Sequence, residues 1–408
     1  MQLLSGAVRN YPWGSRTAIA SLAGRATPTE QPEAELWFGA HPGAPSTLAD
    51  GATLLDLINA DPETNLGAQT VAAYGPQLPF LMKILAAAQP LSIQAHPSKL
   101  QAEEGCALED AAGIDRAAPN RNYRDDNHKP ELIVALTPFR ALAGFRPLAD
   151  TLALLESFQQ AEVERYLPML SREPAAEGDD LRALFTTWIS VPREARVRLI
   201  DAVIAGARFI LPTASGWQKT AAETILSIAE RYPNDVGILA ATLLNVVDLQ
   251  PGEALFLAAG QLHAYVEGLG VEIMANSDNV LRGGLTSKHV DVPELVKVTH
   301  FESLTDPRVP VQQQGSQAVR YPVPISEFQL TRVDVQGAEN YSGGCLAAGT
   351  PRILVCTAGE VRASSAAGEQ LLAPTQGLWV PAAEGDVTLA AVGDRAQVFV
   401  ATVDPGEK

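Results

Sequence analysis

The chain has 408 residues, enough for two or three domains, and its 46% hydrophobic and 19% charged residues are typical of a globular protein. Its net charge of −17 argues against a nucleic-acid partner, which requires clustered lysine and arginine. No apolar run reaches the roughly 20 residues of a membrane helix, and no secretion signal opens the chain, so we expect a cytoplasmic protein with no membrane partner.

The three cysteines support the same compartment. They are scattered along the chain without CxxC spacing, at Cys106, Cys345 and Cys356. This pattern argues against a disulfide framework and against a thiolate metal site. A reducing environment is therefore expected.

The first part of the chain, residues 1–149, is rich in proline, glycine and short apolar runs. Strands are predicted at 79–87 (PFLMKILAA) and 129–136 (KPELIVAL). Residues 150–244 differ, because apolar residues there recur at helical spacing. They predict an all-helical insert with helices at 151–167, 179–189, 193–207 and 219–232.

From residue 245 the pattern returns to short strands and turns, and residues 320–408 are almost entirely β. Segments 251–265 and 371–385 share one rhythm of strand, turn and strand, which predicts matching hairpins of two jelly-roll domains. All six histidines lie between His41 and His300. We therefore expect the C-terminal domain to bind no metal and to serve as a packing partner.

Four residues on strand-like segments form a candidate metal site: Gln94, His96, Glu131 and His263. Positions i and i+2 of a strand point to the same face, so Gln94 and His96 can bind one ion together. A mixed N/O ligand set with an open position is catalytic in character. Taken alone, each histidine is more often a structural one, as we expect for His41, His289 and His300.

Two basic residues near this set, Lys129 and Arg282, each have two possible interpretations. Lys129 and Glu131 are also an i, i+2 pair, so Lys129 either lies beside the metal ligand or is a solvated lysine at the strand start. His128 then points to the opposite face. Arg282, in the loop 276–284 near Asp278, is either a surface residue or a mobile substrate clamp.

Together these segments resemble the type I mannose-6-phosphate isomerase (phosphomannose isomerase) family. The resemblance runs through NYPWGS (10–15), PEAELWFGAHPGAPS (32–46), residues 79–99, NHKPELIVALTPF (127–139) and residues 263–291. It implies a mainly β fold of two cupin/jelly-roll β-domains with an all-helical insert domain. The expected domains are 1–149 plus 245–319, with the metal site, the helical insert 150–244, and a degenerate cupin domain 320–408 without metal.

The resemblance also implies the chemistry, a zinc-dependent interconversion of mannose 6-phosphate and fructose 6-phosphate through a cis-enediol. It implies one Zn²⁺ per chain held by the four residues above, and a sugar phosphate as the small-molecule partner. The oligomeric state, monomer or homodimer, is left undecided. So is the metabolic role, which is either mannose catabolism or GDP-mannose biosynthesis. The remaining pocket residues that it implies are Trp13, Lys83, Ser92, His128, Lys129, Tyr265, Glu272, Asp278 and Arg282.

The roles within this pocket follow from what the isomerisation needs. A base must reach the C1 and C2 protons, and Lys129 is the first candidate, with Glu272 the second. His128 and Asp278 are candidates for ring opening. Arg282 is expected to hold the enediolate or the phosphate, and Ser92 and Lys83 are further phosphate candidates.

Two other functions are compatible with the metal ligands. An iron cupin oxygenase could use two histidines and a carboxylate, although the added glutamine and the adjacent lysine fit it poorly. A non-catalytic cupin that senses a sugar phosphate would keep the ligands but has no reason to keep a lysine beside them. Metal analysis and a turnover assay on mannose 6-phosphate separate these functions.

Overall fold

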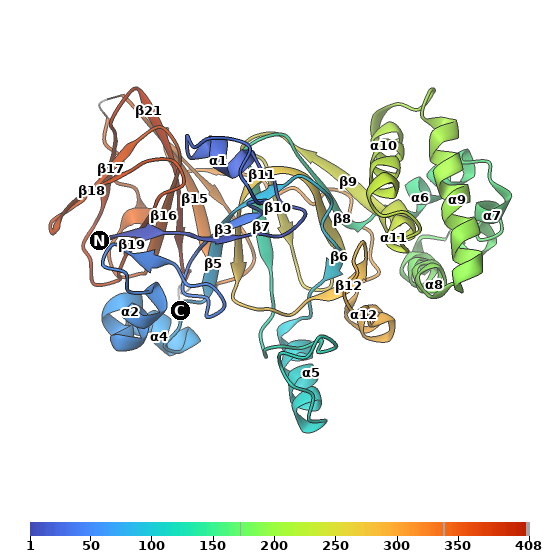
Figure 1. Ribbon diagram of the computed structural model, residues 1–408, viewed down its shortest axis with the longest axis horizontal. Coiled ribbons are helices and arrows are strands. Elements are labelled where there is room, and N and C mark those ends of the chain that lie inside the picture. The colour runs from blue at the N-terminus through green and yellow to red at the C-terminus, as the bar shows by residue number, and fades with distance from the viewer. Residues whose placement is uncertain (172, 338, 405–408) are drawn as a thin grey trace.

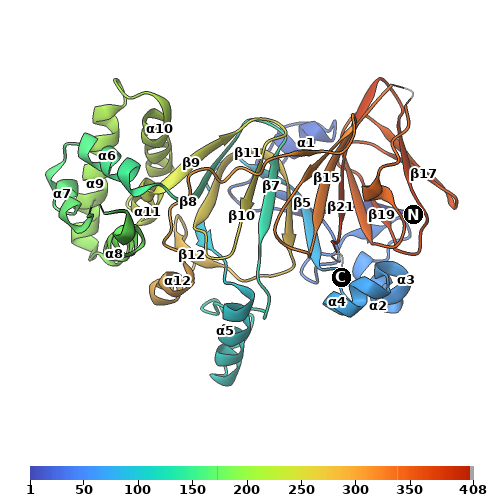
Figure 2. The same ribbon diagram turned by 180° about the vertical axis from the view of Figure 1, so that it is seen from behind.

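The computed structural model describes residues 1–171, 173–337 and 339–404. A central β region lies between a group of helices at one end and a second β region at the other (Figure 1). The view from behind shows the same order (Figure 2). Within the described residues, no helix is long and apolar enough to cross a membrane.

The central sheet is built around the long strand β11 (His263–Ala275), which pairs with β5 and β7 along one part and with β6 and β8 along the other. All of these pairings are antiparallel. The main strand order is β10 (Ala254–Leu257), β7 (Glu131–Ala135), β11, β5 (Phe80–Ala87), β3 (Glu35–Phe38) and β2 (Ala7–Arg9). Off this path lie β6 (Ile93–Ala95), β12 (Leu281–Gly284), β8 (Phe139–Phe145) and β9 (Leu244–Leu249).

Strand β5 is buried on both faces, as its continuous apolar run predicts. Alternate residues such as Met82 and Ile84 face an apolar core shared with the second β region. Lys83 lies on the opposite face, and its Cα partner on β11 is Glu272. The strand thus supplies core on one face and charged side chains on the other.

The second β region has an eight-stranded sheet in the order β13 (Gln312–Gln313), β14 (Ala318–Tyr321), β15 (Gln329–Gln336), β21 (Arg395–Thr402), β16 (Arg352–Ala358), β19 (Gly377–Val380), β1 (Gln2–Ser5) and β4 (Thr47–Leu48). A three-stranded sheet of β18 (Gly368–Leu372), β17 (Val361–Ser365) and β20 (Thr388–Ala391) faces it. Strands β1 and β4 come from the start of the chain, so the sheets do not follow the expected domain limits strictly.

The end group of helices spans the expected insert: α6 (Leu148–Ser157), α7 (Ala161–Glu164), α8 (Glu177–Ser190), α9 (Arg193–Ile210), α10 (Gly216–Arg231) and α11 (Gly237–Leu243). One helix predicted over 151–167 is wrong, because the chain divides it into α6 and α7. The break is at Gln159, whose φ of 51° is left-handed and incompatible with a continuous helix. These helices pack on the β6, β8 and β12 end of the central sheet.

The other helices lie against the β regions. Helices α2 (Leu54–Ala60), α3 (Pro62–Leu66) and α4 (Ala68–Tyr74) cover the second region, and α5 (Lys99–Ala111) projects from the central one. The remaining helices are α1 (Ala18–Leu22) and α12 (Val292–Val298), with 3₁₀ turns at Leu167–Met169, Pro174–Ala176 and Gly344–Leu346.

Candidate metal centre

The centre of the site is a buried cluster of His96, Glu131 and His263, whose ligand atoms all lie within 4.8 Å of one another. Glu131 opens β7, His263 opens β11, and His96 follows β6 by one residue. Glu131 Oε1 lies 3.4 Å from His96 Nε2, and Glu131 Oε2 lies 3.3 Å from His263 Nε2. A search of the described residues for three or more His, Cys, Asp or Glu side chains at metal-binding spacing finds this group.

Gln94 joins this cluster from β6, where it pairs with His263 across the sheet. Its side-chain amide lies 3.4 Å from His263 Nε2. An amide also carries an oxygen, which is the atom that can serve as a metal ligand. The structure thus brings together all four residues of the predicted ligand set.

The outer nitrogens of the two imidazoles are fixed by backbone carbonyls. His96 Nδ1 lies 2.6 Å from the Asn279 carbonyl oxygen, and His263 Nδ1 lies 2.9 Å from that of Gln261. Donation from Nδ1 leaves each Nε2 as a bare acceptor aimed at the cluster, as in metal sites where the second ring nitrogen orients the ligand.

Two atoms of the cluster lack hydrogen bonds although they are buried. His96 Nε2 and Glu131 Oε2 have no hydrogen-bond partner among the residues that the structure describes. Buried polar atoms without partners are costly, and a cation at this position would satisfy both of them. Two imidazole nitrogens, a carboxylate and an amide oxygen are a donor set suited to Zn²⁺.

The protonation states also suit a metal. Burial lowers the pKa of His96 to about 4, so its imidazole is neutral near pH 7. Burial alone would raise the pKa of Glu131, but Lys129 and His96 outweigh it and hold that pKa well below its ordinary value. Neutral imidazole and ionised carboxylate are the forms that bind metals.

A second buried network lies on the neighbouring strands. Lys83 Nζ lies 2.7 Å from Glu272 Oε2 and 3.5 Å from Glu35 Oε1. Burial opposes charge on this amine, but Glu272 and Glu35 outweigh it and raise the pKa of Lys83. Burial raises the pKa of Glu272. Lys83 therefore has its charge compensated by two carboxylates, one of which, Glu35, we did not predict.

Tyr265 and Trp13 form the apolar wall beside this network. The Tyr265 ring is buried and packs edge-on against Phe139, with centroids 5.4 Å apart. Burial and then Glu272 raise the pKa of its hydroxyl. Trp13 packs against the same apolar cluster, and half-buried Ser92 directly precedes β6.

Lys129 reaches the metal cluster, with its Nζ 3.2 Å from Glu131 Oε1. It is 9% exposed, so of the two readings the buried one is correct. It precedes β7 rather than lying on it. The next residue toward the N-terminus, His128, turns away and contacts Glu327.

The rim of the site differs from the expectation at Arg282. We placed it in a loop, as a surface residue or a mobile clamp, but it lies in β12, which pairs with β6, and its Cα partner is Gln94. Asp278 is exposed and lies 3.5 Å from His41 Nε2. His41, expected to be structural, thus borders the site.

Three cations gather at this rim, and two of them were not predicted. Burial and then Arg124 lower the pKa of Arg282, and burial, Arg282 and Arg124 lower the pKa of Lys288. The backbone N–H of Arg124 donates to Asn279 Oδ1 at 2.6 Å, which places Arg124 beside the segment that leads to Arg282. Among the described residues, none of the three has an ion-pair partner within 4.0 Å. In an acidic protein, such a group is suited to an anion.

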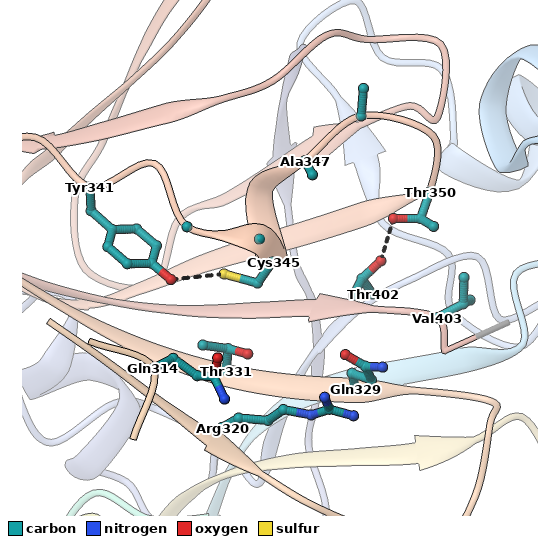
Figure 3. Close-up of a pocket in the computed structure, with 13 residues that line it drawn as sticks. Gln314, Arg320, Gln329, Thr331, Tyr341, Cys345, Ala347, Thr350, Thr402 and Val403 are labelled. Atoms are coloured by element: carbon teal, nitrogen blue, oxygen red, sulfur yellow. Dashed lines mark hydrogen bonds between the residues drawn. The ribbon is translucent and has the colours of Figure 1, made fainter. Parts of the chain in front are cut away.

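A cavity of about 380 Å³ lies in the second β region, and none of the residues that line it belongs to the metal cluster. Figure 3 shows its polar lining, in which the Tyr341 hydroxyl meets Cys345 Sγ at 3.5 Å and Thr402 donates to Thr350. Arg320 lies across from them and also contacts Asp404. No histidine follows His300, so the cavity has no imidazole to bind a metal.

Comparison with known proteins gives one consistent result. Residues 1–148 match the family model for the catalytic domain of type I phosphomannose isomerase. The chain is 40% identical to the mannose-6-phosphate isomerase of Escherichia coli (strain K12) over 98% of this chain and 99% of the relative. The human mannose-6-phosphate isomerase is 32% identical over 98% and 95%.

Solved structures agree over the full length. A crystal structure of a phosphomannose isomerase variant from Salmonella typhimurium has a TM-score of 0.89 and 37% identity, covering 99% of both chains. A structure of a mannose 6-phosphate isomerase bound with zinc and yttrium has a TM-score of 0.88 and 37% identity, again over 99% of both chains.

Proposed function

Because the chain belongs to the type I phosphomannose isomerase family, we propose that it interconverts mannose 6-phosphate and fructose 6-phosphate as a zinc-dependent isomerase. The observation that carries this function is the buried cluster of His96, Glu131 and His263. Two of its polar atoms have no hydrogen-bond partner among the described residues, and a cation would satisfy both. An aldose–ketose isomerisation needs ring opening, loss of the C2 proton and delivery of a proton to C1.

Gln94, His96, Glu131 and His263 would hold one zinc ion per chain. When bound, zinc supplies Lewis-acid stabilisation of the negative charge that develops on the sugar oxygens. The fixed Nδ1 contacts of the two histidines keep their Nε2 atoms oriented before the ion arrives.

Proton transfer between C2 and C1 falls to Lys129 or Glu272 in this proposal. Lys129 is supported by its contact with Glu131, which puts its amine beside the metal ligands. Glu272 is supported by its buried place beside Lys83 and by burial, which raises the pKa of its carboxyl. Asp278 remains a proposed ring-opening residue, and His128 becomes the weaker candidate because its ring is turned toward Glu327.

The phosphate would bind at the cationic rim. Arg282 was the first candidate, and the adjacent Arg124 and Lys288 strengthen it, because an anion would relieve their mutual repulsion. Lys83 is the weaker phosphate candidate, since Glu272 and Glu35 already compensate its charge. Trp13, Ser92 and Tyr265 would shape the sugar pocket.

The finer fold assignment is also a proposal. Two cupin/jelly-roll domains with a helical insert agree with helices α6–α11 between Leu148 and Leu243 and with the two β regions. A cytoplasmic location is supported by the three free cysteines, of which Cys106 and Cys356 are buried. A sugar phosphate is the proposed partner.

The test is turnover of mannose 6-phosphate by purified protein, followed through fructose 6-phosphate formation. We expect about one zinc per chain, loss of turnover after chelation, and recovery when zinc is restored. Glucose 6-phosphate, the C2 epimer, serves as the matched substrate control. Zinc-loaded protein that does not convert mannose 6-phosphate contradicts the proposal.

A further inference from the structure

We infer that Glu327, in the second β region, is a positioning residue for the isomerase site in the central region. It acts through His128 on the segment that carries Lys129. This inference rests on the proposed function and deepens it, since it gives the second β region a part in the reaction.

The contact is short and sheltered. His128 Nε2 lies 2.6 Å from Glu327 Oε1, and the two side chains are 21% and 17% exposed. The residues are 199 positions apart in the sequence. Glu327 stands two residues before β15, and its other oxygen, Oε2, accepts from the backbone N–H of Ser326 at 3.2 Å. The carboxylate is therefore itself held in place.

The charge of the pair supports a fixed contact. Burial alone would raise the pKa of Glu327, but the hydrogen bond and the charge of His128 outweigh it and lower that pKa. The carboxylate is ionised near neutral pH, and a charge-assisted hydrogen bond to an ionised acceptor is stronger than a neutral one.

The backbone on both sides of His128 is held from the central region. The Asn127 carbonyl accepts from Asn279 Nδ2 at 2.9 Å, and the Asn127 side chain donates to the Asn276 carbonyl at 2.9 Å. On the other side, the Pro130 carbonyl accepts from the Ala275 N–H. These contacts hold Asn127 and Pro130, whereas His128 between them is held through its ring by Glu327.

Lys129 lies between these fixed points and owes its position to them. Its long, flexible side chain reaches Glu131 from a residue that is not on the strand. Release of the neighbouring ring would let the segment relax, and small displacements of a reacting group cost large factors in rate. A contact that only joined the two regions would instead affect stability and leave kcat unchanged.

A double-mutant cycle distinguishes these two roles. In zinc-loaded protein, Glu327→Ala is expected to lower kcat about 10-fold, within the roughly 10- to 100-fold range of lost outer contacts, with zinc content unchanged. Glu327→Ala added to His128→Ala is expected to cost nothing further. Glu327→Gln keeps the shape and an acceptor oxygen, so it should recover part of the loss. Glu339→Ala removes an exposed carboxylate of the same region, bonded to Gln317, and should leave kcat unchanged.

A second measurement does not depend on activity. Amide hydrogen exchange in metal-free protein should become faster at His128, Lys129 and Glu131 in Glu327→Ala and stay unchanged in Glu339→Ala. The inference is overturned if Glu327→Ala keeps wild-type kcat and exchange, or if its loss adds fully to that of His128→Ala. Failure of wild-type protein to turn over mannose 6-phosphate would overturn the proposed function alone, since the exchange measurement still tests Glu327.

Discussion

The two β regions differ in the groups that compensate their buried charges. In the central region, Lys83, Glu272, Glu131 and His96 are buried together and depend on one another, with polar atoms left unpaired at the metal cluster. In the second region, the core is almost wholly apolar and its fully buried guanidinium belongs to Arg352. Backbone carbonyls of Leu346, Glu384 and Gly385 accept from that guanidinium.

The difference separates structural polarity from functional polarity. The two terminal nitrogens of Arg352 join loops by hydrogen bonds to neutral carbonyls, and its Nε has no hydrogen-bond partner among the described residues. The central cluster is incomplete without a cation, so its buried charges carry a cost that stability alone does not explain. Each prediction below tests one side of this contrast.

The largest effect is expected at the metal cluster. His263→Ala removes one ligand and should lose bound zinc and lower kcat by about 10³-fold or more, because metal-derived charge stabilisation is worth several kcal/mol. The matched control, His289→Ala, removes an exposed histidine and should keep both. Zinc content by elemental analysis and turnover are the measurements. Full zinc content in His263→Ala would rule out this ligand assignment.

The metal-free cluster should also make the protein sensitive to acid. The pKa of His96 is about 4 in the folded protein and 6.5 in an unfolded chain, so the unfolded state binds the proton more readily between these values. The free energy of unfolding should therefore fall by up to about 3 kcal/mol from pH 6.5 to pH 4. Glu131, whose pKa is lowered, adds a further loss only below its unfolded value of 4.5.

Urea unfolding in the presence of a chelator at pH 7, 6, 5 and 4 measures this effect. Other groups titrate in the same range, so the wild-type protein is compared with His96→Gln at each pH. The free energy of unfolding of wild type should fall relative to that of His96→Gln as the pH is lowered toward 4. Parallel curves for the two proteins would mean that the His96 proton has no such effect.

The identity of the base gives the next effect. Lys129→Met should lower kcat about 10²-fold, the usual scale of a lost general base, with zinc retained. It should also abolish exchange of the C2 proton with solvent deuterium. If exchange survives in Lys129→Met and disappears in Glu272→Gln, then the carboxylate is the base.

The smallest effect on activity is expected in the second region. Arg352→Met removes the donors to several buried carbonyls and should lower the free energy of unfolding by about 2 kcal/mol. Folded protein should keep wild-type kcat and zinc content. Chemical denaturation and turnover check the two parts. A loss of kcat in the folded variant would mean that buried polar groups of the second region also serve the reaction.

The cluster of proposed ligands could be predicted because its information is local. Gln94 and His96 follow the two-residue period of a strand, and the flanking apolar runs mark where Glu131 and His263 begin strands. Lys129 was likewise found through its spacing from Glu131.

The residues that were missed come from distant elements. Glu35 reaches Lys83 because β3 pairs with β5, and Glu327 reaches His128 across 199 residues. Neither contact leaves a periodic signal in the sequence. Arg282 was assigned to a loop because glycines follow it, whereas pairing with β6 makes that segment a strand.

The insertion of β1 into the second sheet has a consequence for how the protein is made. Strand β1 pairs with β19, so that Leu4 lies opposite Gly377. At a ribosomal rate of about 5–20 residues per second, the first strand waits roughly 20 to 75 seconds for its partner to be synthesised. During that interval its edge is open to other chains, and closing so large a loop is slow. Assembly of the second sheet, rather than of the metal-bearing one, is therefore the step at which a growing chain would most need protection by a chaperone.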